Sequence, residues 1–308
     1  MAQLRDVSNG AYAQDLLHKQ VVKLVQLQGP VLAREGSEPL HQMRVAMRRL
    51  STTLGQFEPA LVVPEAVTTQ RLAKWVRRLG MARDLDVLRE RLEDGFLPQL
   101  PAAEVRTLRP VLKQLRRERQ LAYDHVVEVL KSRTYLEALA QLQGWFKDPQ
   151  FTALGLLPIG EWIGDWQLPH LAGLFLHPGW QLAQPGSGEE TLHELRRQLK
   201  QARYRLENTA PLGGARSAAW IGRFKLGQEL LGEYNDLLVL QRAINDQLPG
   251  PLEDQLPQLE WLLVQNQRHC WERWRELVGE LLPRRRRRRL IETLAGPPAP
   301  LCRWRPGW

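Results

Sequence analysis

The stretch LHQMRVAMRRL at residues 40–50 decides the fold, because it returns later in the chain as LHELRRQLKQA at residues 192–202. A second pair of similar stretches follows, LGMARDL at residues 79–85 and LGEYNDL at residues 231–237. The offset is the same 152 residues in both cases, from His41 to His193 and from Asp84 to Asp236. Two matches at one offset indicate a structural unit that the chain uses twice.

Each copy predicts a helix with a basic ladder along one side. At 100° per residue, a histidine and the basic residues after it fall within a narrow arc of the helix. The arc is about 60° wide for His41, Arg44 and Arg48, and about 80° wide for His193, Arg196, Lys200 and Arg203. Arg49 extends the first ladder at a position where the second copy has Gln201.

The apolar residues of both stretches lie on a different face, which predicts one buried stripe on each helix. They are Leu40, Met43, Met47, Leu50 and Leu54 in the first copy, and Leu192, Leu195, Leu199, Ala202 and Leu206 in the second. No acidic residue interrupts either ladder, whereas an ordinary exposed face mixes acids with bases one turn apart. The ladders favour an anionic partner. The alternative is that their cations pair with acids elsewhere in the fold.

The composition also favours a polyanion as the partner. Among 308 residues, 43 Lys and Arg exceed 34 Asp and Glu, which gives a net charge of +9. Six of these cations form the uninterrupted run from Arg284 to Arg289. That run is either a solvated helix end or a non-specific anion patch that assists the ladders.

Several classes of protein are disfavoured by what the sequence lacks. Cys270 and Cys302 are too few for a disulfide framework or a cysteine zinc site, which suits a reducing compartment. The polar N-terminus and the lack of an apolar run of about 18 residues predict a cytoplasmic protein without a membrane span. Because no Walker loop, His-Glu-x-x-His motif or acidic metal cluster is present, we expect no metal, no cofactor and no enzymatic activity.

Apolar spacing between proline and glycine breakers predicts an all-α fold. Gly29-Pro30 is expected to form a turn after the first helix. The expected helices span residues 11–28, 39–57, 64–94, 101–132, 133–147, 189–208, 215–247, 253–282 and 284–295. β-branched alternation is scarce, so a sheet is not expected.

The repeat divides the chain into predicted segments. The first repeat spans residues 1–150, and the second spans 188–295 and includes the arginine run. The connecting segment 151–187 is rich in Trp, Pro and Gly, and its aromatic residues predict that it packs on another element. The tail 296–308 has the composition of a disordered segment.

The spaced motifs of both copies resemble those of the CHAD domain, the conserved histidine α-helical domain. The first copy has His-x-x-Arg-x-x-x-Arg-Arg-Leu at 41–50 and Leu-Gly-x-x-Arg-Asp-Leu-Asp-Val-Leu at 79–88. The second has His-x-x-Arg-x-x-x-Lys-x-x-Arg-Tyr-x-x-Glu at 193–207 and Leu-Gly-x-x-Asn-Asp at 231–236. The resemblance covers about residues 10–290, and two spaced motifs in each half make it specific.

This resemblance implies two four-helix bundles related by pseudo-twofold symmetry after an internal duplication. It also implies a groove or pore lined by basic residues that binds inorganic polyphosphate. Many relatives carry a fused triphosphate-tunnel domain, whose Glu-x-Glu-x-Lys signature is missing here, so a stand-alone member is expected. A location at polyphosphate granules within the cytoplasm would follow from such binding.

The predicted polyphosphate-binding residues are His41, Arg44, Arg48, Arg49, His193, Arg196, Lys200 and Arg203, with Arg83, Lys74, Arg223 and Lys225 as accessory cations. Arg offers forked donors to phosphate oxygens, and Lys a compact charge. The histidines near the helix starts either donate to phosphate when protonated or cap and pack locally. Asp84 and Asp236 either orient a basic residue by a salt bridge or cap a helix end.

Two other functions stay open at the level of sequence. The arginine run and 11 tryptophans would suit an RNA-binding protein, although the ladders carry few aromatic residues on which bases could stack. An enzyme that acts on phosphate chains is the third possibility, although a cationic surface alone holds phosphate without cleaving it.

Overall fold

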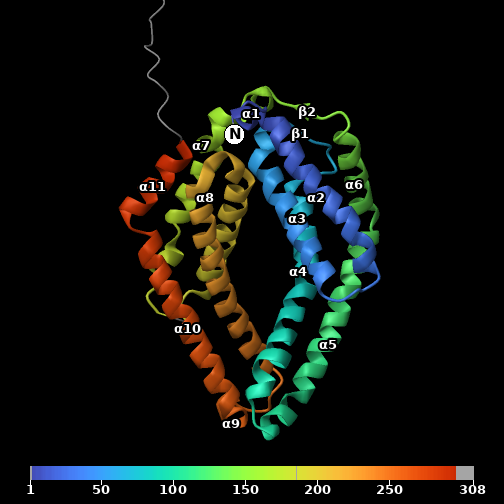
Figure 1. The fold of residues 1–308 in the computed structure, drawn as a ribbon. Coiled ribbons are helices and arrows are strands. Elements are labelled where there is room, and N and C mark those ends of the chain that lie inside the picture. Colours follow the sequence, from blue (N-terminus) through green and yellow to red (C-terminus); the bar gives the residue numbers. More distant parts are fainter. Residues whose placement is uncertain (1, 185, 296–308) are drawn as a thin grey trace, which may run out of the picture. The chain divides into compact units, whose positions relative to one another are not determined.

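Helices form nearly all of the chain in the computed structural model, which describes residues 2–184 and 186–295 (Figure 1). The main helices are α1 (Ala2–Arg5), α2 (Asn9–Leu32), α3 (Glu38–Phe57), α4 (Thr69–Glu90), α5 (Ala102–Lys131), α6 (Arg133–Trp145), α7 (Ile159–Phe175), α8 (Glu189–Asn245), α9 (Leu252–Gln255), α10 (Pro257–Leu281) and α11 (Arg284–Ala295). Shorter helical turns are η1 (Glu58–Ala60), the π-helix η2 (Arg91–Phe96), η3 (Leu97–Gln99), η4 (Leu154–Leu156) and η5 (Pro178–Gln181). The predicted all-α class is confirmed.

The chain folds into two compact units that alternate along the sequence. The larger unit comprises residues 8–157 and 229–273, and the smaller unit comprises residues 2–7, 158–228 and 274–295. The segments 1–150, 151–187 and 188–295 were drawn from the sequence repeat, and they stay a prediction, as does the internal duplication. The predicted disordered tail, 296–308, lies outside the described residues.

In the larger unit, α2, α3, α4, α5 and α6 pack as successive neighbours (Figure 1). Short connections between helices favour this arrangement. The predicted apolar stripe of α3 is confirmed, because each of its residues from Leu40 to Leu54 is at most 3% exposed. Within the described ranges, the only β-sheet is the antiparallel ladder of β1 (Leu61–Val62) with β2 (Gln150–Phe151).

Two polar side chains fix helix starts in the larger unit. The hydroxyl of Thr68 accepts a hydrogen bond from Arg71 N at 3.2 Å and caps α4. The buried carboxylate of Glu104 on α5 accepts hydrogen bonds from Gln258 N and Leu259 N, each at 3.0 Å, at the start of α10. Both satisfy backbone donors that a helix start leaves without an internal partner.

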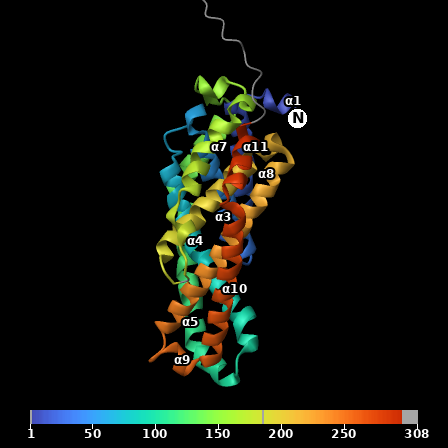
Figure 2. The same cartoon turned by 90° about the vertical axis from the view of Figure 1, so that its left-hand side faces the viewer.

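Most of the Trp-rich connecting segment packs within the smaller unit. This segment forms α7 and η5, and α7 packs against α11 (Figure 2). Trp180 stacks on Trp274 of α10 with ring centroids 5.3 Å apart, while Phe175 contacts Trp220 and Phe224 of α8. The segment therefore contributes to a core and is not a linker.

Helix α8 folds back on itself within the smaller unit, where Figure 1 shows its two arms side by side. A Cβ at Gly227 would meet a methyl carbon of Leu199 at 3.4 Å, although 28 residues separate the two positions. In a straight helix, these residues would lie about 40 Å apart. The chain stays helical through the bend, so the predicted helices 189–208 and 215–247 form one continuous helical element.

Three other sequence predictions need correction. Gly29-Pro30 does not form a turn, because α2 continues through Pro30 to Leu32; the proline lies in the final turn, where the chain is about to leave the helix. The helix predicted from residue 64 begins at Thr69, after the Thr68 cap. The helix predicted for residues 253–282 is interrupted at Leu256, which has a non-helical conformation before Pro257 starts α10.

Among the described helices, none has the length and apolarity needed to span a bilayer.

Candidate anion-binding site

The first basic face comprises His41, Arg44, Arg48 and Arg49 on α3, together with Arg83 on α4. All five side chains are half-buried. Because the apolar stripe of α3 is directed into the core, the ladder lies along the edge of that core. α3 also packs against α4, which brings Arg83 to the same region as the ladder.

Arg44 is held in place from α4. Its Nη2 donates to Asp84 Oδ1 at 3.0 Å, and the Asp84 side chain is 66% exposed, whereas that of Arg44 is only 19% exposed. Gly80 lies one turn before Asp84, and a Cβ at this glycine would meet Arg44 Nε at 3.3 Å. The glycine of the repeated Leu-Gly motif therefore gives the guanidinium room to lie against α4.

Arg83 is held by a carboxylate on its own helix. Its Nη1 donates to Glu90 Oε1 and Oε2 at 3.1 and 3.2 Å. Glu90 Oε1 also accepts a hydrogen bond from Ser37 Oγ at 3.1 Å, just before α3 begins. This network fixes the start of α3, which carries His41, relative to Arg83. Sequence reasoning missed Glu90 and Ser37. The seven-residue spacing from Arg83 to Glu90 was a usable signal for Glu90, because it places these two residues on one face of a helix.

The first basic face contains buried donors that the described residues leave without an acceptor. His41 Nδ1, Arg44 Nε and Arg83 Nε are each inaccessible to solvent and have no hydrogen-bond partner there. A buried N–H group without an acceptor costs roughly 1–3 kcal/mol.

Burial and neighbouring charges lower the pKa of His41. Burial is the main reason that its pKa lies below the ordinary value, and the positive charge of Arg83 lowers the pKa further. Glu38 acts in the opposite direction, and Arg44 again lowers the pKa. A bound anion would reverse the effect of the arginines, so the protonation of His41 is coupled to anion binding.

The second basic face comprises His193, Arg196, Lys200 and Arg203 on the first arm of α8. The predicted apolar stripe beside it is confirmed, because each of its residues from Leu192 to Leu206 is at most 4% exposed. His193 is exposed, and the other three side chains are half-buried. Glu194 forms an ion pair with Arg197, which lies outside the ladder.

Arg203 and Arg196 repeat the donor pattern of the first face. Arg203 packs over the ring of Tyr204, 4.5 Å from its centroid, and lies 3.6 Å from a carboxylate oxygen of Glu207. Arg196 Nε is buried and has no hydrogen-bond partner among the described residues, whereas Arg203 Nε is the atom within ion-pair distance of Glu207. Both basic faces therefore contain a buried guanidinium nitrogen without a hydrogen-bond partner.

Two further titratable groups lie in the smaller unit near the second basic face. Burial lowers the pKa of Arg205. His170 on α7 lies 3.4 Å from Gln198 O, and its pKa is lowered to about 4, mainly by burial and secondarily by the charge of Arg205. Both side chains are half-buried, and sequence reasoning did not foresee them.

The remaining predicted residues lie in different surroundings. Lys74 lies about 120° around α4 from Gly80, so it is not part of the first basic face. Arg223 packs over Trp220, 5.8 Å from the ring centroid, with its Nε 3.8 Å from Glu280. Lys225 is exposed and Asp236 half-buried, both on α8.

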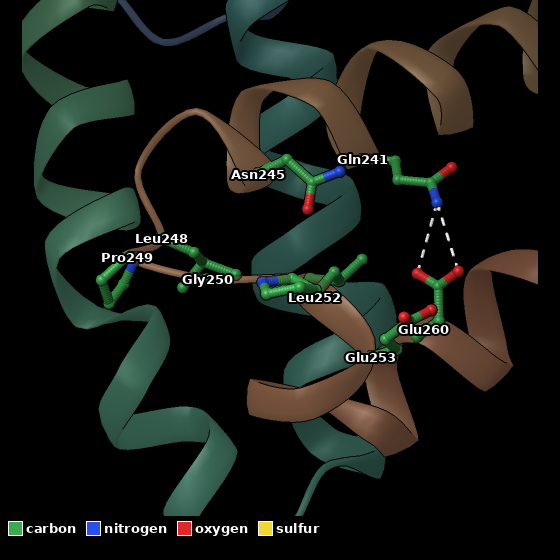
Figure 3. Close-up of a pocket in the computed structure, with 9 residues that line it drawn as sticks. Gln241, Asn245, Leu248, Pro249, Gly250, Leu252, Glu253 and Glu260 are labelled. Atoms are coloured by element: carbon green, nitrogen blue, oxygen red, sulfur yellow. Dashed lines mark hydrogen bonds between the residues drawn. The ribbon is translucent and has the colours of Figure 1, made fainter.

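A cavity of about 490 Å³ at the α8–α9–α10 end of the larger unit has the opposite character (Figure 3). Its lining includes Glu253 and Glu260, and Gln241 Nε2 donates to both oxygens of Glu260 at 3.4 and 3.2 Å. Burial raises the pKa of Glu260, and the charge of Glu253 raises it further. Such a cavity repels phosphate. No group of metal-binding side chains occurs within the described ranges.

Comparison with known proteins finds a matching family and similar solved structures. The sequence profile of the CHAD domain matches residues 15–245. The crystal structure of the CHAD domain from the plant Ricinus communis is 20% identical, with a TM-score of 0.62, and the match covers 89% of this chain and 93% of that one. PptA from Streptomyces chartreusis is 18% identical, with a TM-score of 0.61, and the match covers 89% of this chain and 98% of that one. No curated protein matches the sequence.

Proposed function

Because the chain belongs to the CHAD domain family, we propose that it binds inorganic polyphosphate through its first and second basic faces. The observation that carries this proposal is the set of buried nitrogens without a hydrogen-bond partner among the described residues, His41 Nδ1, Arg44 Nε and Arg83 Nε on one face and Arg196 Nε on the other. These nitrogens are closed to solvent, and we propose that their side chains turn toward a bound polyphosphate, whose oxygens complete their hydrogen bonding.

Polyphosphate suits such a site because it offers only repeated charge to its binding partner. It has no bases to read, so recognition depends on the density and spacing of cations. Arginine provides forked donors for phosphate oxygens, and the release of counterions drives the binding of a polyanion. Because Arg44 and Arg83 are half-buried, a ligand must have a shape that reaches them, whereas a fully exposed basic run accepts polyanions of any shape.

The proposal is one of binding without cleavage. Two carboxylates adjoin the first basic face, and each accepts hydrogen bonds from one of its arginines: Asp84 from Arg44, and Glu90 from Arg83. They orient cations, and neither is placed as part of a carboxylate pair that would activate water. We extend the proposal to a cytoplasmic location where polyphosphate accumulates, which imaging of the tagged protein would test.

A titration of the full chain with long-chain polyphosphate, and with RNA of matched total charge, tests the function. We expect tighter binding of polyphosphate at every salt concentration, and a linear fall of log affinity with log salt for both polymers. Equal or tighter binding of RNA would contradict the proposal and favour nucleic acid as the partner. Release of orthophosphate during the titration would instead favour the enzyme.

A further inference from the structure

A cavity of about 470 Å³ between α4, α5 and the start of α6 forms a second cationic site in the larger unit. We propose that this outer groove binds short inorganic oligophosphates such as triphosphate. It is lined by Arg71, Lys74 and Arg78 from α4, His125 from α5, and the hydroxyl-bearing residues Ser132 and Thr134. None of these was assigned to the polyphosphate-binding faces except Lys74, which sequence analysis counted as an accessory cation.

The outer groove and the first basic face lie on different sides of α4. Gly80 marks the side that faces Arg44 on α3. Lys74 and Arg78 lie about 120° and 160° around the helix from Gly80, on the side that faces α5 and α6. An anion in the outer groove would therefore not contact the first basic face, so the two sites can be tested separately.

The charge pattern of α4 is costly unless an anion compensates it. The helix has no acidic residue before Asp84, and its first half carries Arg71, Lys74, Arg77 and Arg78. The positive end of the helix dipole lies at the start of the helix, where cations are disfavoured and anions are stabilised. An ordinary surface helix places its cations near the other end.

The cations of the groove are available to a ligand. Lys74 and Arg78 are exposed and form no ion pair or hydrogen bond within the ranges 2–184 and 186–295. Arg71 Nη1 donates to Ala66 O at 3.1 Å, which fixes that side chain at the groove while its other nitrogens stay open to an acceptor. His125 is exposed on the facing helix.

The spacing of these cations indicates a chain of a few phosphates. From Arg71 to Arg78 the helix rises about 10 Å, so the cations form a row along the helix and are not gathered at one point. The cavity lies within the range of roughly 300–1,000 Å³ that is usual for small ligands. An oligophosphate can contact the cations of α4 in sequence while its other side approaches His125.

The groove offers little to a nucleic-acid base. Its aromatic residue, Trp75, is only 7% exposed and packs edge-on against Tyr135 with ring centroids 5.4 Å apart. The tryptophan thus offers no ring face for stacking, which is the usual means of holding an unpaired base, and the imidazole of His125 is the only exposed aromatic ring of the groove lining. The same argument disfavours the base of a nucleotide, so the phosphate chain itself is the recognised group.

One carboxylate, that of Glu128, opposes the cations of the groove. It lies one turn from His125 on α5 and belongs to the same lining. Its negative charge should weaken the binding of any anion there. Replacing it therefore gives a readout of opposite sign to the removal of a cation, which a general loss of structure cannot mimic.

The test uses isothermal titration calorimetry with inorganic triphosphate on the full chain. To isolate the outer groove, the parent for this experiment carries Arg44→Gln and Arg196→Gln, which remove the central arginine of each basic face. We expect this parent to bind triphosphate at one site. Lys74→Gln with Arg78→Gln should weaken binding at least tenfold, and Glu128→Gln should strengthen it.

The matched control is Arg109→Gln with Lys113→Gln on α5. These two residues are exposed, have the same residue types four positions apart, and lie outside the groove, so the control changes the net charge equally. Equal weakening by both pairs would overturn the proposal, because it would mean general electrostatics. Absence of triphosphate binding in the parent would also overturn it, as would tighter binding of ATP than of triphosphate, since a base would then be recognised.

These outcomes do not depend on the proposed polyphosphate function. If long polyphosphate fails to bind the unmodified chain, the function fails whatever the groove does. Lys74→Gln with Arg78→Gln is therefore also made with both basic faces intact, and its binding of long polyphosphate is compared with that of the control. If it binds like the control, and the same two changes abolish triphosphate binding when they are made in the isolating parent, the two sites are separate. Circular dichroism on each variant confirms that the helical fold is kept.

Discussion

Arg44 on α3 lies directly against Gly80 on α4: a Cβ at residue 80 would meet Arg44 Nε at 3.3 Å, while Nη2 of the same guanidinium donates to Asp84 at 3.0 Å. A Cβ at position 80 would therefore require the guanidinium to shift by a few tenths of an ångström. Gly80 belongs to the motif that recurs at Gly232, and at Gly80 this contact accounts for a glycine in the middle of a helix, where it costs about 1 kcal/mol relative to alanine.

Gly80→Ala should keep the fold and weaken polyphosphate binding. The added methyl group displaces the Arg44 guanidinium, and the loss should be roughly fivefold, about the contribution of one hydrogen bond. Gly29→Ala in α2 is the matched control, because no heavy atom lies within 4 Å of a Cβ there. Affinity and thermal midpoint are measured for both; an unchanged affinity of Gly80→Ala would remove Arg44 from the site.

Both basic faces should contribute to binding. Arg44→Glu with Arg48→Glu, or Arg196→Glu with Lys200→Glu, should each lower polyphosphate affinity by roughly a hundredfold, since two charge-assisted hydrogen bonds are lost. Arg109→Glu with Lys113→Glu makes the same change of charge on an exposed part of α5 and should have a much smaller effect. A folded double variant of either face that binds as tightly as the parent would show that this face is not used.

Polyphosphate affinity should rise as the pH falls. In the free protein, burial and the charge of Arg83 lower the pKa of His41, and a bound polyanion raises it. The complex therefore takes up a proton, so binding is strongest below the pKa of the free protein and declines as the pH rises through the pKa of the complex. Titrations from about pH 5.5 to 8 measure this change. His41→Gln with His193→Gln should flatten the profile, and an unaltered profile would exclude the imidazoles.

Stability should fall in mild acid because of His170. Burial lowers its pKa to about 4 in the folded protein, while the unfolded chain has the ordinary value near 6.5. The unfolded state therefore binds a proton first as the pH falls, and stability present above pH 6.5 is lost down to about pH 4. The loss is on the order of 3 kcal/mol. Urea unfolding across this range should show His170→Gln to be less sensitive than the parent, with the exposed His269→Gln as control; identical slopes for all three proteins would refute the assignment.

The arginine run should attract polyanions without selecting among them. α11 buries Leu290 and Leu294, while Arg287 donates to Leu282 O and the other five arginines are exposed around the helix. Changing Arg284, Arg286 and Arg288 to Gln should lower the affinity for polyphosphate and for RNA by similar factors and flatten both salt dependences. The ratio of the two affinities, measured at several salt concentrations, should be unchanged. If the preference for polyphosphate disappears in a folded variant, recognition lies in the run.

Local periodicity accounts for what could be predicted about the fold. The buried stripes of α3 and α8 were correctly predicted because apolar residues three and four positions apart lie on one side of any helix. The prediction of a turn at Gly29-Pro30 was wrong, because a proline in the final turn of α2 does not stop the helix before Leu32. The bend that returns Gly227 to Leu199 was also unforeseeable in detail, since the backbone of α8 stays helical through it.

The residues of the two ladders, and the buried stripe beside each ladder, could be read from the chain because both follow from the geometry of a single helix. The partners of these cations, Asp84 for Arg44 and Glu90 with Ser37 for Arg83, became known only from the packing of α3 against α4. The tertiary structure also separated Lys74 from the first basic face and placed it opposite His125. Contacts between helices depend on how their buried faces interlock, and one helix's periodicity holds no information about the neighbour against which it packs.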